Sequence, residues 1–550
     1  MVKKLFFVSL LLSCSFLSRT QVIQPMPAVV VPVFKNDTLN IITQGARGDG
    51  SYLNTREINQ SIQQLSARGG GVVLVPKGLW LTGPLTLLSN INLHLQTGAT
   101  LLFTPDFQSY PLVAGNWEGL PQMRNQSPVS ASNAENIAIT GNGIIDGNGD
   151  AWRMVKKDKL TQSQWSNLIE RGGVLSADKK IWFPTAKVLK GFGESNPGVI
   201  DGKKTAAYYD SVKDFLRPNL LVFSNCKKIL LEGVTFQNSP AWCLHPLLCS
   251  DLTVRGIRVY NPWYAQNGDG IDVESCTNVL IENSVFDVGD DALCMKSGRD
   301  EAGRKRGKAT ENVTIRGCTV YASHGGFVIG SEMSGGVRNI NVSNCTFIGS
   351  DIGLRFKTTR GRGGVVENIF IRDIYMKDIP GDAILFDMYY AAKDPLPLAG
   401  EKRELPAVEF KKKDESTPVF RNFQISNVYV NGAARAIFVR GLPEQHIEGL
   451  QLRNMVFRSR KGIEIQEASN ISLTNIRLDL SSDAPSIDLV QSDGLMFDSV
   501  SVARPPATYI RAAGERLRGI NIRNPALAGV REKIDLELGA KATEIRLEGQ

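Results

Sequence analysis

The 550-residue sequence has no C-x-x-C pair and no glycine-rich loop with the Lys-Ser/Thr ending of a phosphate-binding loop. It also lacks an uninterrupted apolar run of the roughly 20 residues that span a membrane. The formal net charge of +8 is diffuse, so it gives no argument for a nucleic-acid partner. We therefore expect neither a nucleic-acid partner nor a membrane-spanning segment.

The amino terminus predicts export. Two lysines precede an apolar run from Leu5 to Leu12, which is the order of a secretory signal peptide, and we assign this signal to residues 1–20. Residues 21–40 are assigned to a linker. The stretch "LLSC", which ends at Cys14, resembles a bacterial lipoprotein cleavage site. A lipid anchor at Cys14 is therefore an alternative to free export into the periplasm or the medium.

A strand-turn-strand unit recurs about ten times along the chain. Segments such as "KKILLEGVTF", "TNVLIENSVF" and "ENVTIRGCTV" alternate apolar and polar residues around a short Asn, Gly or Asp break. The equivalent residues Asn312, Asn339 and Asn368 stand 27 and 29 positions apart, which is a period of repeat architectures. Because no helix separates successive strands, the pattern predicts an all-β fold, a parallel β-helix with one continuous apolar core.

The rest of the chain fits a single solenoid domain over residues 41–550. A helix-like pattern from about Thr55 to Ala67 predicts an N-terminal helical cap, since a bare end would expose core and unpaired backbone. Two insertions interrupt the period, near 152–218 and near 389–418, and long insertions in solenoids often border the binding face. We expect a monomer.

Cysteines recur at similar positions of successive repeats. Cysteine is among the most buried residue types, so we interpret these residues as small core rungs instead of disulfides or metal ligands. They are Cys226, Cys249, Cys276, Cys318 and Cys345.

Polar residues that are unusual for a buried strand gather in consecutive repeats. Asn267 and Asp269 stand in "QNGDGID", Asp290 and Asp291 in "GDDAL", and His324 in "SHGGF". Stacked rungs lie about 4.8 Å apart, so residues far apart in sequence can form one patch. Adjacent aspartates can reach one cleft only if the backbone bends or bulges, which a preceding glycine permits.

Arg355 and Lys357 follow one repeat later, in "RFKTTRGRGG". They stand two alternating positions apart, so they share a strand face and could clamp the carboxylate of a uronic acid sugar. Clustered carboxylates suit glycosidic bond cleavage, in which one acid protonates the leaving oxygen and another carboxylate activates water or attacks carbon. The residues thus favour an anionic polysaccharide substrate.

The set "NGDGID", "GDD", "SHGG" and "RFK", in this order on a β-helix-like ladder, resembles the polygalacturonases of glycoside hydrolase family 28. The usual family motifs are NTDGxD, DD, GHG and RIK, and the resemblance runs from "GARGDG" to about residue 390. It implies a right-handed parallel β-helix of the pectin-lyase-like type. It also implies inverting hydrolysis of α-1,4-linked galacturonic acid in pectic polysaccharide or oligogalacturonides, without a metal or other cofactor. "GSEMSGG" and "KTTRGRGG" are most similar to the bacterial exo-acting branch.

Carried over by position, the resemblance implies that Asp290 is the general acid. Asp269 and Asp291 would hold and deprotonate the attacking water. His324 would support protonation of the acid, and the Arg-x-Lys pair would bind the sugar carboxylate. Further predicted substrate-binding residues are Asn267, Gly325, His245, Lys296, Glu332 and Arg360.

Three positions depart from the family motifs, because Gly268, Ser323 and Phe356 replace Thr, Gly and Ile. None removes a reacting group, but Gly268 puts the rigidity of the Asp269 loop in doubt. Trp242 is interpreted as a buried rung, with stacking on a sugar as the alternative.

Other functions stay open on the sequence alone. One is a galacturonidase directed at rhamnogalacturonan. Another is a calcium-dependent pectate lyase, with calcium on the aspartates and an arginine as base. A third is a non-catalytic solenoid that binds polysaccharide without producing reducing ends. Exo action would require an insertion that closes one end of the cleft, and both insertions are candidates.

Overall fold

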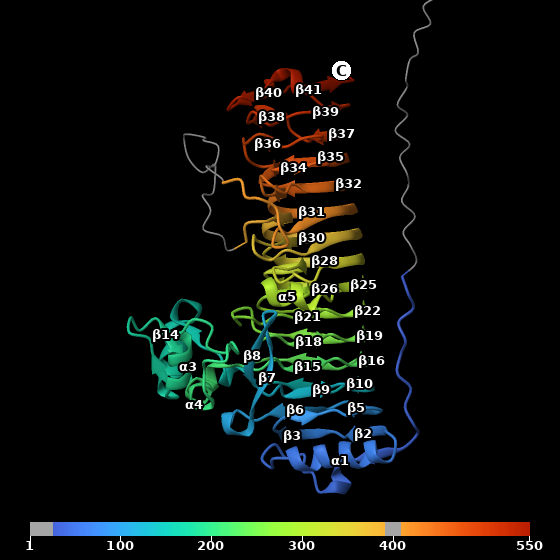
Figure 1. Cartoon of the computed structure of the whole chain (residues 1–550), viewed down its shortest axis with the longest axis vertical. Helices are drawn as coiled ribbons and strands as arrows, with labels where there is room; N and C mark the ends of the chain where they lie inside the picture. Colours follow the sequence, from blue (N-terminus) through green and yellow to red (C-terminus); the bar gives the residue numbers. More distant parts are fainter. Residues whose placement is uncertain (1–25, 391–408, 550) are drawn as a thin grey trace, which may run out of the picture.

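The computed structural model describes residues 26–390 and 409–549. The predicted signal peptide, Cys14 and much of the second insertion lie outside the described residues. Within them, 36 strands form one sheet, and nearly all neighbouring strands are parallel. The strands stack into the elongated right-handed parallel β-helix of Figure 1, which confirms the predicted fold class.

Each coil contributes one strand to each of three columns, and the candidate site lies on the first column. The first-column strands around the site are β18 (Leu244–Leu247), β21 (Ile271–Glu274), β24 (Asp291–Lys296), β27 (Gly325–Ile329) and β29 (Leu354–Lys357). The second column holds β19 (Ser250–Arg255), β22 (Thr277–Glu282), β25 (Thr310–Arg316) and the start of β28 (Val337–Ser350). The third holds β20 (Arg258–Tyr260), β23 (Val285–Asp287), β26 (Thr319–Ser323) and the end of β28.

The stack continues on both sides of these coils. The N-terminal rungs are β1 (Thr38–Asn40), β2 (Gly71–Val75), β3 (Gly78–Thr82), β4 (Leu85–Thr86), β5 (Ile91–Leu95), β6 (Ala99–Phe103), β9 (Val129–Ser132), β10 (Glu135–Gly141), β11 (Ile144–Asp146), β15 (Leu221–Ser224), β16 (Lys227–Glu232) and β17 (Thr235–Gln237). The C-terminal rungs are β30 (Val365–Asp387), β31 (Val419–Arg440), β32 (Ile447–Ser459), β33 (Lys461–Gln466), β34 (Ala468–Ser469), β35 (Ser472–Leu480), β36 (Ile487–Val490), β37 (Met496–Val502), β38 (Thr508–Ala513), β39 (Ile520–Arg523), β40 (Glu532–Glu537) and β41 (Ile545–Glu548).

Strand alternation directs one set of side chains inward. In the first column Ile271, Leu293, Phe327 and Leu354 stand in register on successive rungs and are fully buried. Burying such a side chain stabilises the fold by roughly 1.5–3 kcal/mol. Phe356, which replaces the Ile of the family motif, belongs to the same core. Its ring stacks on the aromatic ring of the next coil, so the replacement affects the packing of the core.

The periodic asparagines form a ladder along one corner of the coil. Asn339 Nδ2 donates to Asn312 Oδ1 at 3.2 Å, and Asn368 Nδ2 donates to Asn339 Oδ1 at 3.2 Å. Their φ angles are 57°, 58° and 58° for Asn312, Asn339 and Asn368, a left-handed conformation that asparagine tolerates better than most residues. The predicted period therefore has a physical basis, since each Asn turns the chain and also bonds the next coil.

All seven cysteines among the described residues are buried and unpaired, as predicted for core rungs. They do not all share one coil position, however. Cys226, Cys249 and Cys276 precede strands of the second column. Cys318 precedes β26 of the third column, and Cys345 stands at the equivalent position inside β28. In both cases a small, buried residue stands at the turn that leads into a strand.

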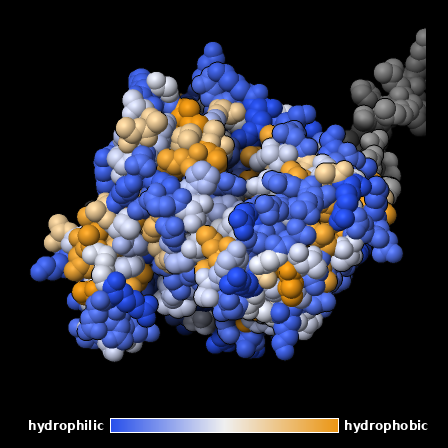
Figure 2. Space-filling view, turned by 90° about the horizontal axis from the view of Figure 1, so that it is seen from below, coloured by the Kyte–Doolittle hydropathy of each residue, from blue (hydrophilic) through white to orange (hydrophobic). Residues whose placement is uncertain are grey.

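Helices cover one end and one side of the stack. Helix α1 (Thr55–Ala67) has the predicted bounds, and its buried Ile58, Ile62 and Leu65 close the N-terminal end of the core. Viewed from this end, hydrophobic residues appear as separate patches in a mostly hydrophilic surface (Figure 2). No helix among the described residues is both long and apolar enough to cross a membrane.

The first insertion is a folded lobe instead of an irregular loop. In Figure 1 it projects sideways from the stack. It contains a three-stranded antiparallel sheet and three short α-helices: β12 (Val155–Lys156), β14 (Ile181–Phe183), β13 (Val174–Leu175), α2 (Gln162–Glu170), α3 (Ala186–Phe192) and α4 (Ala206–Ser211).

A hairpin that the repeat pattern did not predict lies across the first column. It consists of β7 (Leu112–Trp117) and β8 (Leu120–Asn125), and the short helix α5 (Asp300–Arg306) lies beside its tip. The hairpin and α5 both lie on the column that carries the candidate site.

Candidate active site

Three aspartate side chains converge at the start of neighbouring first-column strands. Asp269 stands two residues before β21, Asp290 lies in the bend before β24, and Asp291 is the first residue of β24. One carboxylate oxygen of each lies within 4.8 Å of the others. Asp269 and Asp291 are buried, whereas Asp290 remains partly exposed. The convergence expected from rung stacking is confirmed.

Gly289 allows two consecutive aspartates to reach the same side. A Cβ on this glycine would lie 2.4 Å from the carbonyl oxygen of Pro262, so only glycine fits the close approach of the two turns. The backbone then bends at Asp290, whose Oδ1 accepts the N–H of Asp291 at 3.0 Å. The regular strand begins only after the bend. This bend is the one expected from two adjacent aspartates that reach the same cleft.

The Asp269 loop is firmly held despite its glycine at 268. Asn261 Nδ2 donates to the carbonyl oxygens of Gly268 and Asp269, at 3.1 and 3.3 Å. The N–H of Cys243 on the preceding rung also donates to the Asp269 carbonyl, at 3.0 Å. A Cβ at 268 would approach Ala265 to 2.8 Å, so the local turn excludes the usual Thr. Hydrogen bonds from the Asn261 side chain and the Cys243 backbone to the carbonyl oxygens of this loop hold it rigid.

Two cations on β29 hold Asp291. Lys357 Nζ donates to Asp291 Oδ2 at 2.7 Å, and Arg355 Nη1 donates to Asp291 Oδ1 at 3.1 Å. Burial alone would raise the pKa of Asp291, but these cations together with Lys296 hold it well below its usual range. Arg355 and Lys357 do share a strand face, yet both already bind a catalytic candidate.

Asp290 has the opposite electrostatic environment. Burial and the negative charge of Asp291 raise the pKa of Asp290 above its ordinary value. The ring of His324 lies beside it, with Nδ1 at 3.6 Å from Asp290 Oδ1, an ion-pair distance too long for a hydrogen bond. Its other nitrogen, Nε2, lies 3.6 Å from Asp351 Oδ2, a neighbour that sequence reasoning missed.

A fourth carboxylate, Asp272, lies fully buried next to the cluster. Burial raises the pKa of both Asp269 and Asp272. The charge of Asp272 raises the pKa of Asp269 further, and the charges of Asp291 and Asp290 do the same for Asp272. Neither Asp272 oxygen has a hydrogen-bond partner among the described residues, and the nearest cation is Lys296 Nζ at 3.6 Å. Asp272 is the last residue of the motif "NGDGID", and its place in this motif is the sequence feature that could have identified it as a site residue.

Lys296 and Glu332 form a buried ion pair behind the aspartates. Lys296 Nζ donates to Glu332 Oε2 at 2.9 Å, and Arg362 lies 3.6 Å from the other Glu332 oxygen. Burial alone would raise the pKa of Glu332, but Lys296 and Arg362 lower it to about 2. Both predicted binding residues are thus engaged with protein partners at the edge of the site.

The other predicted binding residues occupy different surroundings. Gly325 stands opposite Asp291 in the strand register, and a Cβ there would lie 3.2 Å from Asp291 Oδ1, so glycine leaves that carboxylate room. Asn267 Oδ1 accepts from Arg217 Nη2 at 2.9 Å. Arg360 binds both oxygens of Glu444, at 2.6 and 2.9 Å.

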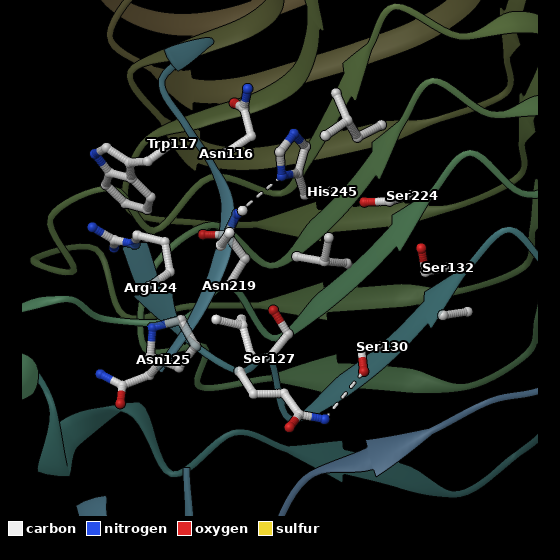
Figure 3. A pocket seen from close by; sticks show the side chains of 18 of the residues that line it. Asn116, Trp117, Arg124, Asn125, Ser127, Ser130, Ser132, Asn219, Ser224 and His245 are labelled. Carbon is white, nitrogen blue, oxygen red and sulfur yellow. Dashed lines mark hydrogen bonds between the residues drawn. The ribbon is translucent and has the colours of Figure 1, made fainter. Parts of the chain in front are cut away.

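His245 is fully buried and lines a separate cavity. Its ring is held between Asn219, 3.1 Å from Nδ1, and Glu274, 2.9 Å from Nε2. The cavity, of about 390 Å³, lies between the β7–β8 hairpin and the first-column strands, with Arg124 and serine side chains on its walls (Figure 3). His245 therefore faces this cavity and the buried Glu274.

The hairpin forms a wall one rung before Asp269. The ring of Trp117 stacks on Trp242 at 5.2 Å, and the Arg124 guanidinium covers Trp117 at 3.8 Å. Trp242 is buried by this contact, which confirms its interpretation as a buried residue. At the hairpin tip Glu118 pairs with Arg299 at 3.2 Å. The first column is thus covered on the N-terminal side of the carboxylates.

The aspartate cluster offers limited ligands to a metal ion. Three carboxylate oxygens lie close enough together to share one cation. Both Asp291 oxygens already accept hydrogen bonds from Lys357 and Arg355, whereas calcium takes roughly six to eight oxygen ligands. The donor set matches a carboxylate pair assisted by cationic side chains better than it matches a calcium cage.

The sequence was compared with protein families and with known proteins. The model of "Glycosyl hydrolases family 28" matches residues 161–412. A probable polygalacturonase of Vitis vinifera is 30% identical over 62% of this chain and 60% of its own length. An exo-poly-alpha-D-galacturonosidase of Dickeya chrysanthemi is 29% identical over 64% of this chain and 57% of its own length. The chain thus spans less than two thirds of the length of either relative.

Solved structures extend the match over most of the chain. The exopolygalacturonase of Thermotoga maritima superposes with a TM-score of 0.65 and 30% sequence identity, covering 82% of this chain and 94% of that one. The family 28 exopolygalacturonase of Yersinia enterocolitica shares the fold, with a TM-score of 0.61 and 23% identity over 85% of this chain and 78% of its own. With its four motifs on adjacent rungs of the same β-helix, the chain belongs to family 28 of the glycosyl hydrolases.

Proposed function

We propose that this protein hydrolyses α-1,4-linked galacturonic acid in pectic polysaccharide, and that it acts from a chain end. The observation that carries the proposal is the convergence of Asp269, Asp290 and Asp291, one of which is held ionised by two cations while the other two have raised pKa values. Such a difference between neighbouring carboxyl groups is what acid and base roles require at one pH.

In the proposed reaction Asp290 donates its proton to the glycosidic oxygen as the bond to the anomeric carbon breaks. A water molecule held by Asp269 and Asp291 attacks that carbon and gives one proton to the carboxylate pair. The productive form therefore carries a proton on Asp290 and leaves Asp269 ionised. Asp269 is the better proton acceptor, since its proton affinity is raised, whereas Asp291 stays anionic and orients the water.

The spacing of the carboxylates allows this water. An oxygen pair up to 4.8 Å apart can be bridged by one water at hydrogen-bond distances of about 2.7–2.8 Å. The spacing is nonetheless shorter than the roughly 6.5–9.5 Å between carboxyl groups of most inverting enzymes and nearer to the roughly 5–5.5 Å of retaining ones. We propose inversion because both oxygens of Asp291 accept hydrogen bonds from cations, which makes Asp291 a poor nucleophile.

The hairpin wall supports exo action. Trp117, Trp242 and Arg124 close the first column one rung before Asp269, and Lys296 Nζ lies 4.9 Å from the Trp242 ring. A polymer could therefore extend from the carboxylates only toward the C-terminal rungs. In this proposal the closing element is the hairpin between residues 112 and 125, whereas the sequence suggested the two insertions as candidates.

A polysaccharide substrate cannot cross a membrane unaided, so the proposed activity also supports export. Residues 1–20 carry the order of a secretory signal, and Cys14 offers the alternative of a lipid anchor. Labelling with a radioactive fatty acid distinguishes the two, because only a lipidated chain would incorporate it, and Cys14→Ser would abolish the labelling.

Product analysis tests the function. Homogalacturonan, trigalacturonate and rhamnogalacturonan oligosaccharides should be incubated with the protein, with and without a chelator. We expect saturated galacturonate monomer from homogalacturonan from the start, at an unchanged rate under chelation. An unsaturated product or loss of activity on chelation would identify a lyase, and release only from rhamnogalacturonan would change the substrate. Binding without new reducing ends would identify a non-catalytic solenoid.

A further inference from the structure

A second cavity borders Asp290 on the side of the folded lobe. It measures about 280 Å³, and we call it the lobe pocket. One wall comes from the insertion, another from the turn between β20 and β21, and the third from the site itself. Its lining residues are Met154, Val155, Lys156, Lys159, Trp263, Tyr264, Ala265, Gln266, Asn267, Gly289, Asp290 and His324.

Two features of the lobe pocket point to a ligand. The indole of Trp263 is 58% exposed, which is unusual for so large an apolar side chain. Lys159 Nζ lies 4.7 Å from the centre of that ring, so a cation is held over the aromatic face. A second ammonium, that of Lys156, belongs to the same wall. Among the described residues neither lysine forms an ion pair with a carboxylate.

An aromatic ring beside unpaired ammonium groups has the chemistry of an acidic-sugar site. The apolar face of a pyranose can pack on an indole ring, and an ammonium group attracts the carboxylate of a uronic acid. The lining includes Asp290 and His324 but neither Arg355 nor Lys357. Two cationic groups therefore flank Asp290, one on β29 and one on the lobe.

We propose that the lobe pocket is a second uronate-binding subsite, in which Trp263 supports the sugar ring while Lys159 and Lys156 bind its carboxylate. This proposal rests on the proposed function. The subsite would hold the galacturonate residue that is next to the scissile linkage, on the side away from Arg355 and Lys357. The lobe then has a role in substrate selection, since it favours a chain with unesterified carboxylates on both sides of the cleaved bond.

Lys159→Gln and Trp263→Ala test the subsite, and both residues are exposed, so the fold should tolerate the changes. The matched control is Lys157→Gln, because Lys157 is a neighbouring exposed lysine whose ammonium lies 6.0 Å from Trp165 and which does not line the lobe pocket. Thermal melting should be the same for all four proteins.

We expect the KM for digalacturonate to rise about tenfold in Lys159→Gln and in Trp263→Ala, with kcat changed less than KM. Added salt should raise the KM of the wild type more than that of Lys159→Gln, since screening acts on the ammonium–carboxylate attraction. Lys157→Gln should match the wild type. KM values within twofold of the wild type for both pocket variants would overturn the proposal.

Calorimetric titration with trigalacturonate keeps this outcome separate from the fate of the proposed function. The titration uses Asp290→Asn, alone and combined with Lys159→Gln or with Lys157→Gln. We expect weaker binding only in the combination with Lys159→Gln. If the wild type did not cleave galacturonan at all, the hydrolytic function would fail, while equal binding by all three proteins would refute the subsite.

Discussion

The backbone N–H of Asp291 donates to Asp290 Oδ1 at 3.0 Å, so two consecutive aspartates share a hydrogen bond and yet have opposite surroundings. Asp291 is bonded by Lys357 and Arg355, whereas Asp290 faces the negative charge of Asp291 and a more distant His324 ring. Their pKa values therefore shift in opposite directions. The predictions for Asp290, Lys357 and the pH profile depend on this difference.

Asp290→Asn removes the proposed acid while leaving the shape of the bend. We expect kcat on homogalacturonan to fall by about 10²–10⁴-fold, because proton donation to the leaving oxygen is lost. Binding of trigalacturonate, measured by calorimetry, should remain. Turnover close to that of the wild type would contradict the role of Asp290.

Lys357→Met tests the electrostatic support of Asp291. Loss of the ammonium at 2.7 Å should raise the pKa of Asp291, so this carboxyl would take up a proton at a higher pH. Lys357 also lowers the pKa of Asp290, so loss of the ammonium should move the pH profile of kcat/KM upward by about one pH unit. An unshifted profile would show that the carboxylates do not depend on the charge of Lys357. Lys157→Met, at an exposed lysine outside the site, provides the control.

The pH dependence of wild-type activity should be bell-shaped. The productive form needs an ionised Asp269 and a protonated Asp290, so the two carboxyl groups share one proton, and the rate rises as the pair loses its first proton and falls as it loses its second. Both pKa values are raised, so activity should extend above the ordinary titration range of aspartate. The profile of kcat/KM on trigalacturonate measures this directly, and a rate that rises steadily to alkaline pH would rule out the acid.

Shortening the hairpin tests exo action. Replacement of residues 113–124 by a short Gly-Ser linker removes Trp117 and Arg124 and opens the N-terminal side of the cleft. The variant should release oligomers early, whereas the wild type should release monomer from the outset. Chromatography of early products decides, with circular dichroism as the check on folding. Monomer alone from both proteins would place the closure elsewhere.

Glu332→Gln probes the buried ion pair through stability. The pKa of Glu332 is about 2 in the folded protein, below its ordinary value of 4.5, so ionisation favours the folded state. That stabilisation is complete above the ordinary pKa and is lost as the pH falls toward 2. Near neutral pH the variant should lose roughly 3 kcal/mol of unfolding free energy. In urea unfolding the difference from the wild type should shrink below about pH 4.5; a constant difference would contradict the assignment.

The repeat period predicted much of the fold because it records backbone geometry. Asn312, Asn339 and Asn368 occupy one turn on successive coils, and this spacing fixes which strands stack. The α1 cap followed from helical periodicity. Hairpin β7–β8 was missed, since its strands show no repeat and its position depends on contacts such as Trp117 with Trp242.

The sequence predicted which residues form the candidate site better than it predicted the contacts between their side chains. Sequence spacing placed Asp269, Asp290 and Asp291 on neighbouring rungs, but it could not show which cation each would meet. Lys357 reaches Asp291 only because β29 lies two rungs beyond β24 in register. Asp351 comes close to His324 for the same reason, through a turn on another coil.

The stereochemistry of the first product tests the account most directly. Proton NMR during cleavage of trigalacturonate by the wild type records the anomeric form of newly released galacturonate before it equilibrates. Attack by a water between Asp269 and Asp291 predicts that the β-anomer appears first. First formation of the α-anomer would mean double displacement through an aspartate, and an unsaturated product would mean elimination; either result would contradict the proposed hydrolysis.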